Sequence, residues 1–237
     1  MTLYVFDVDG TLTEPTRRMS DDFAAFFAGW ARGKRYFLTS GSTLETMRRQ
    51  IPPGVMSNAE GWFPCMGNEF WEHGKQVYGR HTGWPLGLFE LLLETAAASK
   101  FKGGEPPYMQ ERAGMVCFST AGRNADATIR ARYVAFDARR HEREKIAARL
   151  RKKYPDLSVM AGGQTSIDIA PKGMDKGQIL RAIRWGSSLP IMFFGDRTEP
   201  GGNDYPLLEA LRDEGSIVNA AFQVSGPDET RAKLESL

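Results

Sequence analysis

The chain has 237 residues, a formal net charge of +2 and two cysteines. This length allows one large domain or two small ones with a real core, and the near-neutral charge predicts no bulk attraction to a polyanion. Cys65 and Cys117 provide neither a disulfide framework nor a C-x-x-C metal pair, and both are expected to be small buried residues. The most apolar helical stretch, 86–98, contains two glutamates and is too short to span a bilayer, and no signal peptide is visible. We therefore expect no membrane contact and a reducing, cytoplasmic setting.

The first part of the chain alternates segments that are typical of strands and helices. Short β-branched and aromatic runs predict buried strands, and Ser20 is a typical helix-capping residue. The Pro-Pro-Gly at 52–54 is expected to end one helix and Pro85 to begin another. The expected elements are a strand at 3–6, a helix from Ser20 to Gly33 with an aromatic core face, a strand at 35–39, a helix at 43–50, small strands between 62 and 78, and a helix from Pro85 to about residue 100.

The middle of the chain has a different pattern, which predicts an antiparallel sheet with helices on one side. Strand-helix alternation then resumes, so the core is expected to be built from both ends of the chain. We therefore predict an α/β fold with a doubly wound parallel-sheet core of residues 1–80 and 172–237 and an inserted α+β cap domain of residues 81–171. The later expected elements are strands at 108–112, 114–119, 157–161 and 166–170 around a basic helix at 136–153, then a helix at 176–185, a strand at 191–194, a helix at 207–211, a strand at 216–218 and a helix from Asp228.

Asp7 and Asp9 lie two residues apart, directly after the first expected strand. Ligands bind at the carboxyl ends of the strands in a parallel α/β sheet. Two carboxylates there repel each other and suit a hard cation with oxygen ligands, best Mg²⁺, and an aspartate beside Mg²⁺ can attack phosphorus to form an aspartyl-phosphate. An Asx turn with a glycine is the ordinary alternative. An EF-hand is excluded because Leu12 and Arg18 stand where a calcium loop needs Gly and Glu.

The segment from Asp7 to Thr13 resembles the D-x-D-G-T-L-T signature of the haloacid-dehalogenase-like superfamily. The resemblance implies that Asp7 is the nucleophile and that its metal is also held by the backbone carbonyl of Asp9. It further implies that Asp9 acts as the general acid and base, as in the phosphatases and mutases of the superfamily.

Later segments carry further polar residues to the same expected edge of the sheet. Ser40-Gly41-Ser42 ends the second strand, where small residues with free N–H groups can hold a phosphate. Asp196 follows the strand at 191–194, and Asp204 ends a Gly-Gly-Asn-Asp run soon after it. In the superfamily pattern Ser40 is a phosphate-binding hydroxyl and Lys176 balances the charge of nucleophile and phosphate. The same pattern makes Asp196 a metal ligand and Asp204 either a further ligand or the support of one.

The match narrows to the eukaryotic-type phosphomannomutases. Their G-D-x-T-x-P-G-G-N-D segment is similar to residues 195–204, and their G-G-x-x-S-x-D-x-x-P-x-G-x-D-K segment is similar to residues 162–176. A third pattern, R-x-G-M followed by G-R and a further R, is matched by Arg112 to Met115, Gly122-Arg123 and Arg130. The resemblance covers nearly the whole chain and implies the superfamily core with a type IIB cap.

A mutase that moves a phosphoryl group between two oxygens of one sugar passes through a bisphosphate, so it must hold a second phosphate far from the nucleophile. Arginines provide permanently charged, bidentate groups for this purpose, although each arginine alone is more often a surface charge. Arg112, Arg123 and Arg130 are the candidates, with Ser166 for the phosphate and Asp168 for the sugar hydroxyls. The substrate-binding set that the resemblance implies is Arg17, Arg112, Met115, Arg123, Arg130, Ser166 and Asp168.

The chain also departs from the family pattern. The usual arginine shortly after the first motif is Thr16, and either Arg17 or Arg18 is expected to replace it. An asparagine expected in the cap is Cys117, and the usual Glu-Asn-Gly near the domain junction reads Cys65-Met66-Gly67. The catalytic core therefore matches while the substrate-reading part differs, which leaves open both mannose versus another hexose and mutase versus phosphatase.

We predict a hexose-phosphate mutase that interconverts mannose 1-phosphate and mannose 6-phosphate, with Mg²⁺ as cofactor and hexose 1,6-bisphosphate as activator. A Mg-dependent sugar-phosphate phosphatase is the alternative. Nucleic-acid binding through the basic stretch at 139–153 is a minor alternative, because interleaved Glu and Arg are typical of a solvated helix. The expected partner is a small hexose phosphate, with a second copy of the chain through the cap domain. The expected catalytic residues are Asp7, Asp9, Ser40 and Lys176, and the expected metal-binding residues are Asp7, Asp9, Asp196 and Asp204.

Overall fold

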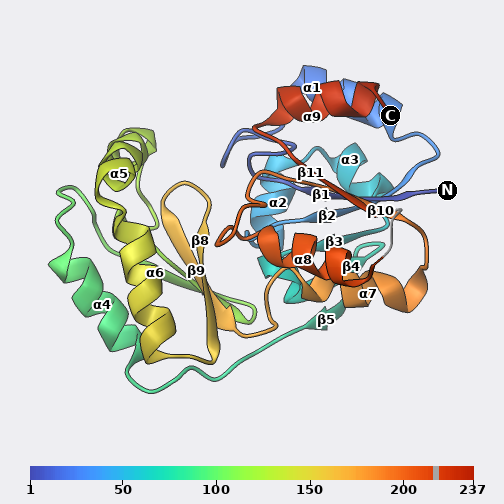
Figure 1. The fold of residues 1–237 in the computed structure, drawn as a ribbon. Coiled ribbons are helices and arrows are strands. Elements are labelled where there is room, and N and C mark those ends of the chain that lie inside the picture. The colour runs from blue at the N-terminus through green and yellow to red at the C-terminus, as the bar shows by residue number, and fades with distance from the viewer. Residues whose placement is uncertain (216–218) are drawn as a thin grey trace. The chain divides into compact units, whose positions relative to one another are not determined.

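The computed structural model describes residues 1–215 and 219–237 of the chain. These residues form two compact units, a core unit of residues 1–80 and 175–237 and an inserted unit of residues 81–174. Each unit has its own sheet (Figure 1). Each also has its own hydrophobic core. The inserted unit extends to Met174 because the N–H of Lys172 donates to the carbonyl of Asp156 and that of Met174 to the carbonyl of Pro171, at 2.9 and 3.0 Å.

The core unit contains a seven-stranded sheet in the order β11-β10-β1-β2-β3-β4-β5. The five strands from β11 to β3 run parallel, and β4 and β5 are added as an antiparallel edge. The strands are β1 (Leu3–Asp7), β2 (Arg35–Thr39), β3 (Gly61–Phe63), β4 (Glu69–Glu72), β5 (Lys75–Gly79), β10 (Ile191–Gly195) and β11 (Ala220–Gln223). The helices are α1 (Asp21–Trp30), α2 (Leu44–Gln50), α3 (Pro53–Asn58), the 3₁₀ turn η1 (Cys65–Gly67), α7 (Gln178–Gly186), α8 (Tyr205–Asp213) and α9 (Pro227–Glu235).

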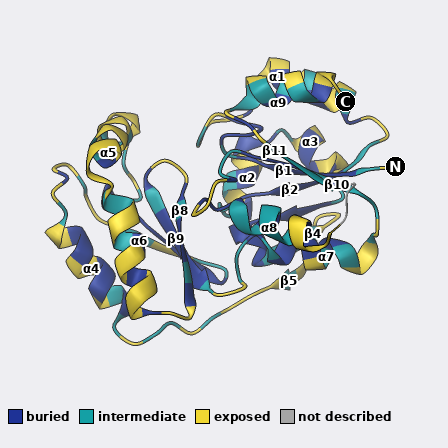
Figure 2. Cartoon of the chain, viewed as in Figure 1, coloured by how far each residue is buried: buried dark blue, intermediate teal, exposed yellow. Residues whose placement is uncertain are grey.

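Side chains that alternate along β1 fill two cores, one on each face of the sheet. Tyr4 and Phe6 point to the side of α1, where Phe6 packs edge-to-face on Phe27 with ring centroids 5.2 Å apart. Leu3 and Val5 belong to the opposite core, which α7 and α8 cover. The central strands are accordingly buried along their length (Figure 2). This arrangement confirms the predicted doubly wound α/β core.

The inserted unit contains a four-stranded antiparallel sheet in the order β6-β7-β9-β8. Val116, Phe118, Ile167 and Ile169 lie on one face of the sheet and form a core with α4 and α6. The predicted antiparallel sheet with helices on one side is therefore confirmed. The elements are α4 (Leu88–Ala98), β6 (Met109–Arg112), β7 (Met115–Phe118), α5 (Ala127–Arg140), α6 (Glu142–Lys153), β8 (Leu157–Gly162) and β9 (Ser166–Pro171).

Several predicted elements differ from the structure. The single basic helix expected at 136–153 is wrong, because α5 and α6 are separated at His141, whose φ of 51° ends one helix and starts the next. Buried Asp137 stabilises the break by accepting from the backbone N–H and Nε of Arg143, at 2.9 and 2.7 Å. The Pro-Pro-Gly segment does end α2, but Pro53 also begins α3, which was not predicted. The strand expected at 216–218 lies outside the described residues.

No helix in the described ranges is long and apolar enough to cross a membrane.

Candidate active site

The carboxyl edge of the parallel sheet in the core unit brings the predicted polar residues together. Strands β1, β2 and β10 are neighbours, and their registers place Phe6 opposite Phe194 and Asp7 opposite Thr39. Asp7 ends β1, while Ser40 and Asp196 are the residues that follow β2 and β10. The geometry of a parallel sheet therefore delivers three side chains, separated by up to 189 positions, to one edge.

Three carboxylates converge at this edge. Oxygen atoms of Asp7, Asp196 and Asp204 all lie within 4.8 Å of one another. Asp204 reaches the cluster from the residue before α8, and its Oδ2 accepts the backbone N–H of Arg197 at 3.0 Å. The approach is close enough that a Cβ on Gly10 would lie 2.4 Å from an Asp196 oxygen.

Lys176 places its ammonium group inside this cluster. The side chain is fully buried, and Nζ donates to Oδ1 of Asp7 and to Oδ1 of Asp204, each at 2.5 Å. Lys176 lies two residues before α7, and the turn that holds it is closed by hydrogen bonds from the N–H groups of Gln178 and Ile179. A charged group can be buried at acceptable cost only when it is paired and hydrogen-bonded, and here one ammonium is shared by two carboxylates.

The burial of this cluster changes how its groups titrate. Burial raises the pKa of Asp7 well above its ordinary value, the charges of Asp204 and Asp196 add to the rise, and Lys176 opposes it. Burial also raises the pKa of Asp196 to about 7, with a further rise from Asp204. The burial of Lys176 alone would lower its pKa, but the charges of Asp204 and Asp7 outweigh that effect and raise it. Lys176 therefore stays charged at neutral pH.

The charge count of the cluster fits a divalent metal ion. Three ionised carboxylates and one ammonium leave a net charge of −2, and the raised pKa of Asp7 and Asp196 shows that this excess is costly without further positive charge. Carboxylate oxygens are ligands that hard divalent cations prefer. The acidic cluster could therefore bind a metal ion.

The carboxylate of Asp9 forms its hydrogen bonds with groups outside the acidic cluster. Its Oδ1 accepts the backbone N–H of Thr16 at 2.7 Å and the amide of Gln50 at 2.8 Å, while Oδ2 accepts the hydroxyl of Ser42 at 3.4 Å. Thr16 has a φ of 65°, which is an unusual backbone conformation for a β-branched residue. The loop after the first motif is therefore shaped so that the backbone N–H of Thr16 contacts Asp9.

Ser40 is fully buried at the end of β2. Its Oγ accepts the backbone N–H of Ser42 at 3.0 Å, and its backbone is fixed by hydrogen bonds with Phe63 and Met66. Met66 and its neighbour Cys65 both have positive φ values, so two adjacent non-glycine residues adopt the left-handed conformation beside this edge. The strained turn replaces the Glu-Asn-Gly of the family pattern.

The inserted unit collects polar side chains on the face of its sheet that the helices leave uncovered. The registers pair Gln110 with Cys117 and Cys117 with Asp168, which makes a row across β6, β7 and β9. Arg112 and Ser166 belong to the same alternating set because each lies two residues from a member of the row. The thiol of Cys117 is buried, which raises its pKa, as does the charge of Asp168, while Arg112 and Arg123 oppose the rise.

Gln110 connects two of the predicted substrate-binding arginines. Its Oε1 accepts Nε and Nη2 of Arg112 at 3.1 and 2.8 Å and Nη2 of Arg123 at 3.5 Å. The Nε of Arg123 is buried without a hydrogen-bond partner among the described residues. Two guanidinium groups thus share one neutral acceptor.

The remaining predicted residues lie as follows. Met115 is fully buried at the start of β7, and Arg130 lies in the first turn of α5. Arg17 is exposed in the core unit, and its carbonyl faces the amide of Gln50 at 3.4 Å. Sequence reasoning missed Gln50 and Gln110, because a glutamine in a helix or an edge strand gives no signal that it will contact a functional side chain.

Solved structures with similar folds have very different sequences. The C-terminal domain of trehalose-6-phosphate phosphatase from Candida albicans matches with a TM-score of 0.66 and 17% identity, over 99% of this chain and 91% of that one. An N-terminally truncated IMP-nucleotidase from Plasmodium falciparum matches with a TM-score of 0.65 and 13% identity, over 100% of this chain and 68% of that one. At these identities the comparison supports the fold alone.

Sequence comparison is more specific. The phosphomannomutase of Saccharomyces cerevisiae is 31% identical over 247 residues, which cover 100% of this chain and 94% of that protein. The phosphomannomutase of Arabidopsis thaliana is 30% identical over 98% of this chain and 95% of that protein, and that of Encephalitozoon cuniculi is 29% identical over 99% and 92%. The family model for eukaryotic phosphomannomutase matches residues 38–237. The chain belongs to the eukaryotic phosphomannomutase family.

Proposed function

We propose that the protein interconverts mannose 1-phosphate and mannose 6-phosphate through a phosphoaspartate and a hexose bisphosphate. The observation that carries the proposal is the buried cluster in which Lys176 is shared by Asp7 and Asp204, found in a chain that is similar to phosphomannomutases over its whole length. The Asp7 carboxylate is already oriented by the hydrogen bond from Lys176. One of its oxygens lies within 4.8 Å of an oxygen of Asp196, the residue that follows β10.

In the proposed reaction, a carboxylate oxygen of Asp7 forms a bond to a phosphorus atom of the hexose bisphosphate while the bond from that phosphorus to the sugar oxygen breaks, which leaves a hexose monophosphate and phosphorylated Asp7. In the return step a hydroxyl of a hexose monophosphate takes the phosphoryl group back and restores the bisphosphate. Asp9 donates its proton to the leaving sugar oxygen and accepts a proton from the other hydroxyl in the return step. The Thr16 N–H and the Gln50 amide hold the Asp9 carboxylate in place for both steps. Lys176 keeps the Asp7 carboxylate oriented and reduces its repulsion of an incoming phosphate.

Asp7, Asp196 and Asp204 would hold Mg²⁺, together with the backbone carbonyl of Asp9. When bound, Mg²⁺ supplies positive charge against the phosphate oxygens and the nucleophile. Ser40, at the same edge of the sheet, would hold a phosphate oxygen through its hydroxyl. A hexose 1,6-bisphosphate would serve as activator by phosphorylating Asp7 before the first turnover.

We propose that residues 81–171 act as a substrate-specificity cap. Arg112 and Arg123, gathered by Gln110, offer charged donors for the phosphate that is not reacting. Arg130 and Ser166 would add contacts to that phosphate, with Asp168 for the sugar hydroxyls and Met115 beneath the same face. In the core unit, Arg17 would bind substrate in place of the arginine that the family pattern has at Thr16.

We also propose that two copies of the chain pair through the inserted unit, where Leu86, Leu93 and Val134 are large exposed hydrophobic side chains. Size-exclusion chromatography with light scattering tests this pairing. A monomer at all protein concentrations would contradict it. We expect no nucleic-acid partner and a cytoplasmic location.

The proposed reaction is tested by ³¹P NMR with α-mannose 1-phosphate, Mg²⁺ and hexose 1,6-bisphosphate. We expect the signal of mannose 6-phosphate to grow, with little inorganic phosphate. Release of inorganic phosphate alone, even with saturating bisphosphate, would instead support a Mg-dependent sugar-phosphate phosphatase that uses the same carboxylates.

A further inference from the structure

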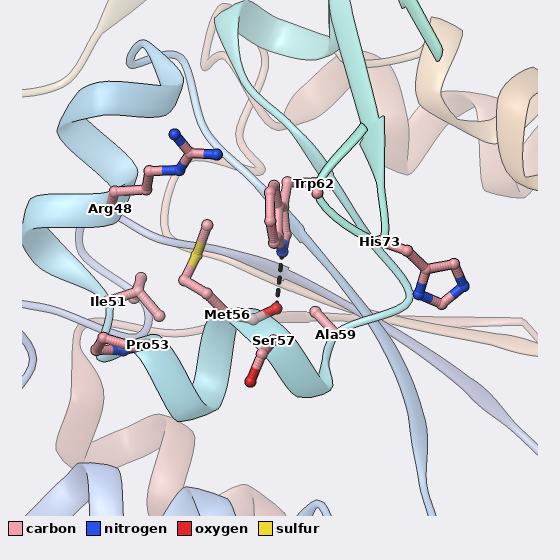
Figure 3. Close-up of a pocket in the computed structure, with 9 residues that line it drawn as sticks. Arg48, Ile51, Pro53, Met56, Ser57, Ala59, Trp62 and His73 are labelled. Atoms are coloured by element: carbon pink, nitrogen blue, oxygen red, sulfur yellow. Dashed lines mark hydrogen bonds between the residues drawn. The ribbon is translucent and has the colours of Figure 1, made fainter. Parts of the chain in front are cut away.

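A cavity of about 530 Å³ lies in the core unit, on the side of α2 and α3, away from the residues of the acidic cluster. We name it the Arg48 pocket. Ile51, Met56 and Trp62 supply an apolar floor, and Arg48, Ser57 and His73 supply polar groups at the wall (Figure 3). A volume in this range with an apolar lining and a few polar groups is typical of small-molecule sites.

Arg48 is the charged group of this pocket. Its guanidinium lies over the rings of Trp62 and Trp71, 5.7 and 5.8 Å from their centroids. Among the described residues no carboxylate forms an ion pair with it and no acceptor takes a hydrogen bond from it. Its neighbour Arg49 differs, because Nη2 of Arg49 pairs with Glu45 at 3.3 Å.

The two indoles that support Arg48 are themselves fixed. Nε1 of Trp62 donates to the carbonyl of Met56 at 2.9 Å, as the dashed line in Figure 3 shows. Nε1 of Trp71 donates to Oε2 of Glu69 at 2.7 Å. A guanidinium held against fixed rings loses less freedom when it binds a ligand, because part of its ordering is already present in the free protein.

Stacking uses the face of a guanidinium and leaves its N–H edge available. That edge presents donors in the fixed geometry that matches a planar carboxylate with two parallel hydrogen bonds. The carboxylate-bearing neighbours Glu45 and Glu69 are already engaged by Arg49 and Trp71, so they do not compete for Arg48. We propose that the Arg48 pocket binds a small carboxylate with an aromatic or branched apolar body, carboxylate on Arg48 and body against Met56 and Trp62.

The test uses 2-naphthoate as the probe and the full-length protein labelled with ¹⁵N. The chain has five tryptophans, so the indole N–H signals give one readout for each. Addition of 2-naphthoate should shift the Trp62 and Trp71 signals in a saturable way and leave those of Trp30, Trp84 and Trp185 in place. The uncharged 2-naphthamide should bind more weakly.

Arg48→Met keeps the length of the side chain and removes its charge, and we expect it to weaken 2-naphthoate binding about fivefold or more. Arg49→Met, one residue away, should leave the binding unchanged. Equal binding by the Arg48→Met variant, or shifts spread over all five indoles, would overturn the proposal, as would the absence of any shift. The result does not depend on mutase activity, so its failure and the failure of the proposed function are distinguishable.

Discussion

Lys176 shows how one residue can set the chemistry of a site. Its ammonium is fully buried and is shared by Asp7 and Asp204 at 2.5 Å each, so it orients the Asp7 carboxylate and opposes the rise in pKa that burial causes. The same contact places a positive charge where a phosphate would approach. Removing such a partner leaves a buried charge uncompensated, which typically costs about 3–5 kcal/mol.

Asp7→Asn should abolish both sugar-phosphate isomerisation and hydrolysis, because an amide cannot form the phosphoaspartate. The variant should remain folded, since the amide oxygen can still accept from Lys176. Progress is followed by ³¹P NMR, with circular dichroism as the check on folding. Asp21→Asn, at an exposed position in the first turn of α1, is the matched control and should retain activity. Turnover of Asp7→Asn near the wild-type rate would rule out the covalent mechanism.

The stability of the metal-free protein should depend on pH through the titration of Asp196. Its pKa is raised from 3.8 to about 7 in the folded state, so between these values the native protein holds a proton that the unfolded chain has lost. Stability should therefore fall as the pH rises through this window. Mg²⁺ needs the ionised carboxylate, so its stabilising effect should grow over the same range.

Thermal unfolding at about pH 5.5 and about pH 8, with EDTA or with Mg²⁺, measures this dependence. Asp196→Asn removes the contribution of this group to the proton linkage and should make the EDTA curve less steep. A stabilising effect of Mg²⁺ that is equally large at both pH values would contradict the assignment.

Gln110→Leu should raise KM for the hexose phosphate about fivefold with a smaller change in kcat, because Arg112 and Arg123 lose their shared acceptor. Gln110→Glu keeps an acceptor oxygen and should preserve more of the affinity. Steady-state kinetics with each variant separate the two parameters. An unchanged KM in Gln110→Leu would show that the arginines do not depend on this contact.

The loop that follows β1 also determines the geometry of the acidic cluster. Gly10 has a φ of 80°, and a Cβ there would lie 2.4 Å from an Asp196 oxygen, whereas Gly33 has a φ of 70° with nothing within 4 Å. Alanine at either position pays the cost of a left-handed conformation, about 1–2 kcal/mol. Only Gly10→Ala should also displace Asp196 and weaken Mg²⁺ binding, which calorimetric titration can measure. Equal Mg²⁺ affinity in Gly10→Ala and Gly33→Ala would contradict this.

The strands and their ends could be predicted because their signals are local. Apolar runs such as 3–6 and 191–194 end at Asp or Gly, and the parallel fold then brings those ends together without further information. The break at His141 could not be predicted, since charged residues stand on both sides of it and its support is a side-chain contact between Asp137 and Arg143 that no spacing rule reports. The extra helix after α2 was missed for a related reason, because Pro53 reads equally well as a breaker and as a first helical residue.

The candidate site also has some features that could be predicted from the sequence and others that could not. The motifs and the strand order predict that the carboxyl edge of the sheet carries Asp7, Ser40 and Asp196. The contacts of Gln50 with Asp9 depend on how α2 packs in three dimensions, and no spacing in the sequence reports them. The pKa of Lys176 likewise depends on its contact with Asp204, which forms only in the folded protein. No motif in the sequence reports that contact.

At the scale of the whole molecule, the two candidate activities share the acidic cluster and differ in what the inserted unit must do. A mutase binds its bisphosphate in two opposite orientations. The binding of the phosphate that lies far from Asp7 is therefore needed in both half-reactions. Arg123→Ala should therefore severely lower isomerisation of hexose 1-phosphate while slow hydrolysis of acetyl phosphate survives. Loss of a charged hydrogen bond costs about 1.5–3 kcal/mol, which is about ten- to a hundredfold in rate.

The matched control for that experiment is Arg139→Ala, because Arg139 is exposed on α5 and its Nε contacts the carbonyl of Ala135 on the same helix. Isomerisation should be unaffected in the control. Parallel losses of isomerisation and of acetyl phosphate hydrolysis in Arg123→Ala would mean that the variant damages the fold or the core unit rather than the distal phosphate site.

The contact between Lys176 and Asp7 spans 169 positions in the chain, with the whole inserted unit between them. During synthesis Asp7 therefore leaves the ribosome 169 residues before its counter-charge. The inserted unit is contiguous and is complete earlier, and contiguous domains generally fold as units while the chain is still growing. The nascent protein would thus complete its inserted unit first, and the buried acidic edge would close only when strands β10 and β11 of the central sheet leave the exit tunnel.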